Sequence, residues 1–186
     1  MQLWNLLKDV VAEVMDPPGE HARARPSARG VKAAAGATKN GAMARHRTRP
    51  VSSRQVAYDR MVREMLATHK VRVRRWRASM SGIAWYVTYR DGSVQRLIEA
   101  PRPKSPMSAA IFLHEIGHHA IGFNVYKPRC LEEYHAWKYA LAQMDAWGIE
   151  VTERVKTRVE KSLKYAVGKA KRRGIRRVPE ELVGYC

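Results

Sequence analysis

The sequence has few cysteines, few acidic residues and no long apolar run. Its 186 residues include only two cysteines, Cys130 and Cys186, which excludes a disulfide framework and a zinc cluster held by four thiolates. A reduced, cytoplasmic setting is the simplest expectation for such a chain. No stretch of about 18 apolar residues is present, so we expect no transmembrane helix and no membrane partner.

Acidic residues are about half as common as basic ones, 17 against 35, and the formal net charge is +18. This charge favours a polyanionic partner such as nucleic acid, although net charge does not determine a fold. The apolar fraction of 45% is ordinary for a globular core and excludes disorder of the whole chain. The length suits one compact domain with tails.

The charge is distributed unevenly, and its distribution predicts three regions. Residues 17–55 have nine basic residues, one acidic residue and almost no large apolar side chain. They cannot bury enough surface to offset the entropy of ordering, so we expect a disordered basic linker there. Residues 1–16 have apolar side chains at helical spacing ahead of Pro17, which predicts a short amphipathic helix. The folded domain is then expected over 56–186.

Capping signals predict helices before and after a group of strands. Ser52 or Ser53 is a candidate N-cap for a first helix that reaches about residue 68. Ser105 followed by Pro106 is a typical start for a second helix. The apolar periodicity predicts the later helices at about 107–122, 130–147 and 152–173.

Strand signals lie between the first and the second helix. Alternating β-branched and aromatic residues predict strands at 71–79 and 82–90. Asp91 and Gly92 predict a two-residue hairpin turn that leads into a third strand at 93–100. The expected fold class is therefore α+β, with a small antiparallel sheet or hairpin packed on helices.

The stretch IFLHEIGHHAIG contains the candidate catalytic residues. His114 and His118 are four residues apart, so on a helix both imidazoles project from one face about one turn apart. This spacing allows two nitrogens to bind one zinc ion at about 2.0–2.1 Å. Glu115 lies beside the first histidine, where it can act as a base on a metal-bound water without being a ligand. His119 faces away from that site and has no assigned role.

A catalytic zinc usually has a third protein ligand, and the stretch CLEEYHAWKYALAQM contains the candidates. Ala136 and Ala140 share a helix face with Glu132 and Glu133. Two small residues four apart allow this helix to approach the HExxH helix closely. His135 lies about 100° or more away from that face and is the weaker candidate. Helical geometry alone does not separate Glu132 from Glu133.

These two segments resemble the gluzincin metallopeptidases, and most of all the phage-type ImmA/IrrE-like proteins. The resemblance covers roughly residues 56–145 and implies a minimal zincin-like domain with Zn²⁺ as its cofactor. Those families have a glutamate ligand three residues ahead of a small residue, which is Ala136 here. Trp137 follows it, where related enzymes often have Asp or Asn. The resemblance implies this site: ligands His114, His118 and Glu133, with Glu115 as general base.

The function implied by this resemblance is zinc-dependent hydrolysis of peptide bonds, with an intracellular regulatory protein as substrate and a phage or mobile element as the setting. The resemblance also implies that the strand at 82–90 forms the edge of the cleft, where a substrate peptide adds as a further strand. The sequence does not decide which residue stabilises the oxyanion. The candidates are Tyr134, Tyr139 and Tyr165.

A second function class remains open. Residues 17–55 and 151–177 are both strongly basic, and the latter range has eleven basic residues against two acidic ones. Either segment could contact nucleic acid without sequence preference, and a solvated helix face explains 151–177 equally well. The alternative hypothesis is therefore a basic nucleic-acid-binding accessory protein with a structural or vestigial zinc site. Glu115 argues against it, because a purely structural site needs ligands but no base.

Overall fold

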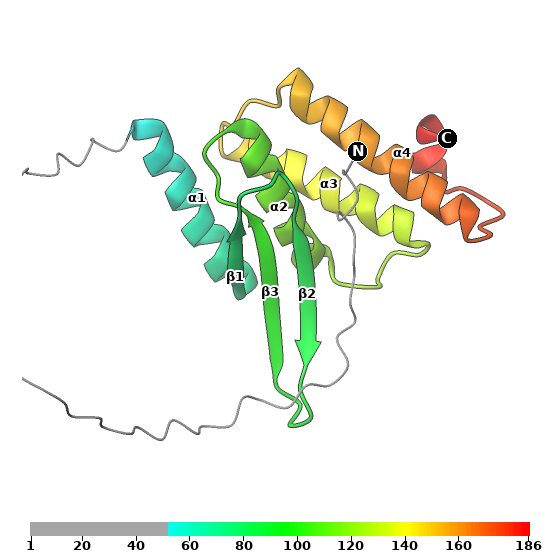
Figure 1. Cartoon of the computed structure of the whole chain (residues 1–186), viewed down its shortest axis with the longest axis horizontal. Helices are drawn as coiled ribbons and strands as arrows, with labels where there is room; N and C mark the ends of the chain where they lie inside the picture. The colour runs from blue at the N-terminus through cyan, green and yellow to red at the C-terminus, as the bar shows by residue number, and fades with distance from the viewer. Residues whose placement is uncertain (1–51) are drawn as a thin grey trace, which may run out of the picture.

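The computed structural model describes residues 52–186, and its fold class is α+β, as expected (Figure 1). The helix expected over 1–16 and the linker up to residue 51 lie outside the described residues.

The elements, in chain order, are α1 (Ser53–His69), β1 (Val71–Arg77), β2 (Ile83–Thr88), β3 (Val94–Pro101), α2 (Pro106–Ile121), α3 (Arg129–Ala146), α4 (Glu153–Arg172) and the 3-10 helix η1 (Glu180–Tyr185). Helix α1 thus begins three residues before the domain boundary expected at 56.

The expected caps begin the first two helices. Ser52 is the N-cap of α1, and its hydroxyl accepts a hydrogen bond from the backbone N of Gln55 at 3.2 Å. Ser105 caps α2 and exchanges hydrogen bonds with Ser108, while Pro106 occupies the first helical position. These bonds satisfy backbone N–H groups that have no partner within the helix. The sequence therefore determines where the HExxH helix starts.

The sheet is mixed: the expected antiparallel hairpin is present as β2 and β3, whereas the expectation of a wholly antiparallel sheet is wrong because β1 is parallel to β3. Its strand order is β1-β3-β2, with β3 parallel to β1 and antiparallel to β2. Ile98 and Ala100 of β3 are wholly buried, whereas three consecutive residues of β1, Arg74 to Trp76, are exposed. An apolar strand suits the centre of a sheet and an arginine-rich strand suits its edge. The third strand therefore lies between the first two.

The turn between β2 and β3 is one residue longer than expected. The carbonyl of Tyr89 accepts a hydrogen bond from Gly92 N at 3.0 Å, and the carbonyl of Ser93 accepts one from Tyr89 N at 2.9 Å. Gly92 has a φ of 78°, whereas Asp91 keeps a negative φ. Arg90 and Asp91 thus form a type I turn, and Gly92 forms the bulge of a three-residue hairpin loop.

Helix α2 is the centre of the domain. It packs against the sheet, α1, α3 and α4 (Figure 1), and every residue from Ser108 to His119 is buried. Helix α4 buries the expected apolar stripe, which includes Val155, Val159 and Leu163. A helix that is buried on all sides can hold polar side chains away from water. None of the helices in residues 52–186 is both long and apolar enough to cross a membrane.

Helices α2 and α3 lie close together at Gly117. A Cβ at this position would lie 2.8 Å from the carbonyl oxygen of Ala136 and 3.3 Å from its Cα. Ala136 and Ala140 are fully buried, as the close approach of this helix requires. Gly117 is the matching small residue on α2, and helix separation depends on the side chains at the contact. Glu133 lies three residues before Ala136 and is thereby brought beside α2.

We expect Gly117→Ala to destabilise the fold, because the new methyl group would meet backbone atoms of α3. Overpacking of this kind costs about 1–3 kcal/mol, which exceeds the gain of roughly 1 kcal/mol that alanine has over glycine in a helix. Gly168→Ala in α4 is the matched control, since its Cβ would lie at an ordinary 3.5 Å from Arg172 Nη1. Urea unfolding should show a loss for the first variant and none for the second. Equal stability of the two variants would contradict the close contact.

Candidate metal centre

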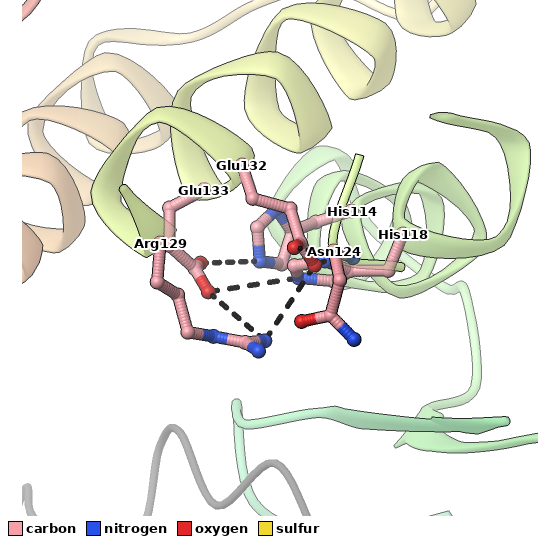
Figure 2. Close-up of polar contacts among 6 residues, drawn as sticks. All are labelled: His114, His118, Asn124, Arg129, Glu132 and Glu133. Carbon is pink, nitrogen blue, oxygen red and sulfur yellow. Dashed lines mark hydrogen bonds and ion pairs between the residues drawn. The ribbon is translucent and has the colours of Figure 1, made fainter. Parts of the chain in front are cut away.

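The structure brings the three expected ligands together. His114 and His118 project from α2 and Glu133 from α3, and one candidate ligand atom of each lies within 4.8 Å of the other two (Figure 2). Nε2 of His114 is 3.4 Å from Glu133 Oε2, and Nε2 of His118 is 3.9 Å from Glu133 Oε1. All three side chains are buried, with 5%, 2% and 3% of their residue surface exposed. This buried group could hold a metal ion.

The donor atoms of this group fit a metal ion. Glu133 Oε1 is buried and has no hydrogen-bond partner among residues 52–186. His118 Nε2 and Arg129 Nη2 each lie 3.9 Å from this oxygen, too far for a hydrogen bond. The oxygen is therefore free to accept a hydrogen bond or to bind a metal ion. Two imidazole nitrogens and one carboxylate are the protein ligands of a His₂Glu zinc site, in which a further position is left for water.

The charges in the cluster also favour a cation. Burial tends to lower the pKa of His118, but the carboxylates of Glu133, Glu132 and Glu115 outweigh it and raise that pKa to about 9. Burial lowers the pKa of His114 to about 4, although Glu133 opposes the shift. Burial tends to raise the pKa of Glu133, but the charge of His118 and a hydrogen bond with His114 hold it at about 2. The cluster therefore stabilises one positive charge, which a divalent ion would supply in place of the His118 proton.

Glu132 holds His118 from the opposite side of its ring. Its Oε1 lies 3.3 Å from His118 Nδ1, and its Oε2 accepts a hydrogen bond from the backbone N of Asn124 at 3.0 Å (Figure 2). Glu132 thus orients the imidazole so that Nε2 faces the cluster, as carboxylates commonly do for metal-binding histidines. The geometry separates the two adjacent glutamates: Glu133 faces the cluster, and Glu132 lies behind His118.

Trp137 packs against the other histidine of the cluster. Its ring stacks on His114 with centroids 4.2 Å apart and an interplanar angle of 21°. His114 Nδ1 is buried and has no hydrogen-bond partner within the described residues. Trp137 directly follows Ala136, at the position where the sequence resemblance to gluzincins implies Asp or Asn. On its Nδ1 side, the orientation of His114 is therefore set by aromatic packing and not by a carboxylate.

Glu115 lies against the segment that begins β2. Its side chain is buried, and a Cβ on Gly82 would overlap its carboxylate oxygen Oε1. Gly82 immediately precedes β2, so only a residue without a side chain leaves this space to the carboxylate. The charge of Glu115 contributes to the raised pKa of His118, which places the carboxylate within electrostatic reach of the cluster. The sequence alone gave no reason to single out Gly82.

Arg158 of α4 is a further charged group at this site that the sequence alone did not identify. Burial lowers the pKa of Arg158, and the Glu115 carboxylate partly offsets that effect. Its charge also contributes to the lowered pKa of His114. Nη2 of Arg158 donates to the carbonyl of Met80 at 3.1 Å, in the loop ahead of β2. Its position in the sequence could have indicated this, because Arg158 precedes Val159 and therefore lies at the edge of the buried stripe of α4.

The other histidines considered have contacts outside the cluster. His135 stacks on Tyr126 with ring centroids 3.8 Å apart, which agrees with its place as the weaker candidate ligand. His119 turns toward the sheet, where its Nε2 lies 3.1 Å from the carbonyl oxygen of Leu97. Neither residue belongs to the candidate metal group found among the described residues.

The three candidate tyrosines remain without an assigned role. The hydroxyl of Tyr139 lies 2.7 Å from His69 Nε2, so its contact is with the end of α1. Tyr134 packs edge-on against His135 with ring centroids 5.4 Å apart. Tyr165 is half-buried on α4. Arg158 interacts electrostatically with Glu115, whereas Tyr134 and Tyr139 contact other residues.

Comparisons with known proteins identified no relative of this chain. No family model, no curated protein and no solved structure matches the chain at a significant level. The resemblance to gluzincins therefore remains a hypothesis that rests on the HExxH segment, Glu133 and their geometry.

We expect Glu132→Gln and Glu133→Gln to weaken zinc binding to different extents. Loss of an orienting carboxylate typically lowers metal affinity by about 10–100-fold, whereas Glu133→Gln removes the charge of a ligand and should cost more. Competition with a chromophoric chelator measures both affinities. His119→Gln is the control, because this buried histidine faces the sheet. If Glu132→Gln lost more zinc affinity than Glu133→Gln, Glu132 would be the ligand and Glu133 the orienting carboxylate.

Proposed function

We propose that the protein is a zinc-dependent metallopeptidase that hydrolyses peptide bonds of a protein substrate. The observation that carries the proposal is the buried cluster of His114, His118 and Glu133, with the buried Glu115 next to the first histidine on the same helix. Three ligands leave a position for water, and a carboxylate that is not a ligand supplies a base. A purely structural metal site would need no such carboxylate.

The residues present suggest how the reaction proceeds. Nε2 of His114, Nε2 of His118 and a carboxylate oxygen of Glu133 would hold the ion. A bound zinc ion lowers the pKa of its water toward about 7 and polarises the scissile carbonyl. Glu115 takes the proton of the attacking water and returns it to the leaving amine. Arg158 adds a positive charge beside Glu115, where it offsets the negative charge that develops on the carbonyl oxygen.

The position of β2 supports an extended substrate. The strand order β1-β3-β2 makes β2 an edge strand of the described sheet, and an edge strand can pair with an added peptide strand. Gly82 and Glu115 meet at the start of this strand. A peptide paired with β2 would therefore pass beside the proposed base, in line with the cleft edge expected at 82–90.

The nucleic-acid-binding alternative has weaker support. Helix α4 has the basic outer face expected for 151–177, because its apolar stripe is buried. Two of its lysines form ion pairs on the same helix, Lys156 with Glu153 and Lys164 with Glu160. Such a face is also what a solvated helix presents. Glu115 has a chemical role only in the metallopeptidase, so we prefer that function.

We expect Glu115→Gln to retain zinc and to lose hydrolysis, because glutamine keeps the shape but cannot take up the proton. General acid–base catalysis contributes typically 10²–10⁴-fold, so the rate on a quenched-fluorescence peptide library should fall by about that factor. Glu64→Gln is the control, since Glu64 is exposed on α1. Hydrolysis that survives in Glu115→Gln with zinc still bound would contradict the proposed base.

We expect Gly82→Ala to lower the hydrolysis rate of the folded, zinc-loaded protein. The added methyl group would meet the Cγ and Cδ atoms of Glu115 at 2.5 and 2.6 Å, so this buried side chain must shift as a whole and the carboxylate leaves its position. Gly184→Ala is the matched control, because nothing lies within 4 Å of its Cβ position. If both variants hydrolyse peptides at the wild-type rate, the space at Gly82 does not position the base.

A further inference from the structure

A cavity adjoins the candidate metal centre. It has a volume of about 300 Å³ and lies between the N-terminal turn of α3 and the C-terminal half of α4. Glu133 belongs both to the lining of this cavity and to the ligand cluster. Because the two sites share a side chain, a group bound in the cavity lies next to the metal centre. The volume is at the lower end of the range typical of ligand pockets.

The lining combines apolar and basic groups. Ala166, Ala170 and Ile175 contribute apolar surface, and the basic residues are Arg129, Lys169 and Arg173. Lys169 and Arg173 are four residues apart, so they are neighbours along one side of the chain at the end of α4. The lining thus includes three basic residues and one acidic residue, Glu133.

Arg129 lies at the boundary between the cavity and the metal centre. Its Nη2 is 3.6 Å from Glu132 Oε1 and 3.9 Å from Glu133 Oε1 (Figure 2). A metal ion on Glu133 would compete with Arg129 for the charge of that carboxylate. The cavity would then be more positive in the metal-bound protein than without the ion.

We propose that this cavity binds the side chain of a glutamate in the substrate, so that the protein selects acidic peptides. The apolar surface matches the two methylene groups of that side chain, and the basic groups match its carboxylate. This inference rests on the proposed function and names the substrate class of the same site. It assigns Lys169 and Arg173 to substrate selection and gives them no part in the chemical step.

The test measures peptide binding without turnover, in the full chain carrying Glu115→Gln. The probes are fluorescent, N-acetylated and C-amidated decapeptides of glycine and alanine with one central Glu, Gln or Lys. Anisotropy in zinc-containing buffer should show the Glu peptide binding about ten-fold more tightly than the Gln peptide, as expected for a charge-assisted contact. No detectable binding of the Glu peptide, or equal affinity for the two, would overturn the proposal.

Charge reversal provides the matched comparison. In Lys169→Glu with Arg173→Glu, the preference should shift from the Glu peptide to the Lys peptide. The control pair, Lys171→Glu with Arg172→Glu, changes the net charge equally on exposed positions of the same helix that do not line the cavity. The control pair should keep the preference for Glu. An equal loss in both pairs would show a general charge effect and would overturn the assigned cavity.

Two further probes identify other occupants. A decapeptide whose only carboxylate is its free C-terminus should bind no better than the Gln peptide, and tighter binding would assign the cavity to a chain end instead. A 12-nucleotide single strand that displaces the Glu peptide and depends on Lys169 and Arg173 would assign it to nucleic acid.

Failure of the proposed function gives a different result. A preference for Glu that depends on Lys169 and Arg173 would stand even if no peptide were hydrolysed. Zinc-dependent hydrolysis by the wild type without any preference for Glu would overturn the cavity proposal alone.

Discussion

The contact of Gly117 with Ala136 determines how closely α2 and α3 approach each other, and the candidate metal centre depends on that separation. A Cβ at 117 would lie 2.8 Å from a backbone oxygen of α3, so any larger residue would push the helices apart. Metal ligands must reach one ion at about 2.0–2.2 Å. The carboxylate of Glu133 can lie beside both histidines of α2 only because the two backbones are this close.

Around that contact, each polar side chain of the site is held by a different neighbour. Oε1 of Glu132 lies 3.3 Å from Nδ1 of His118, and Trp137 stacks on His114. The missing side chain of Gly82 leaves room for Glu115. Burial makes every charge in the cluster costly on its own, and the histidines and carboxylates offset one another. The site is therefore both an electrostatic unit and part of the packing of the core.

Local signals in the sequence were sufficient to predict where the first two helices begin and which two histidines belong to the site. Ser52, Ser105 and Pro106 mark helix starts by capping, which depends on neighbouring residues only. The four-residue spacing of His114 and His118 likewise requires only that the segment be helical. The choice of Glu133 over Glu132 came from a family resemblance, and the geometry that distinguishes them involves two helices.

Features that depend on contacts between distant segments could not be predicted. Strand β3, which is more apolar than β1, is central in the sheet. This position depends on all three strands and cannot be predicted from one strand alone. Gly82 and Arg158 come near Glu115 only after β2 and α4 have packed around α2. The hairpin turn differs for a local reason: Asp91 accepts a hydrogen bond from Ser93 N at 2.8 Å, which favours a type I turn with a bulge at Gly92.

X-ray absorption at the zinc edge of the reconstituted protein tests the central claim most directly, because it identifies the atoms bound to the ion. We expect two imidazole nitrogens and two oxygens, from Glu133 and water, at about 2.0–2.2 Å. A zinc–sulfur distance of about 2.3 Å would instead indicate binding by Cys130 or Cys186. That result, or a shell without imidazole, would contradict a metal centre formed by α2 and α3.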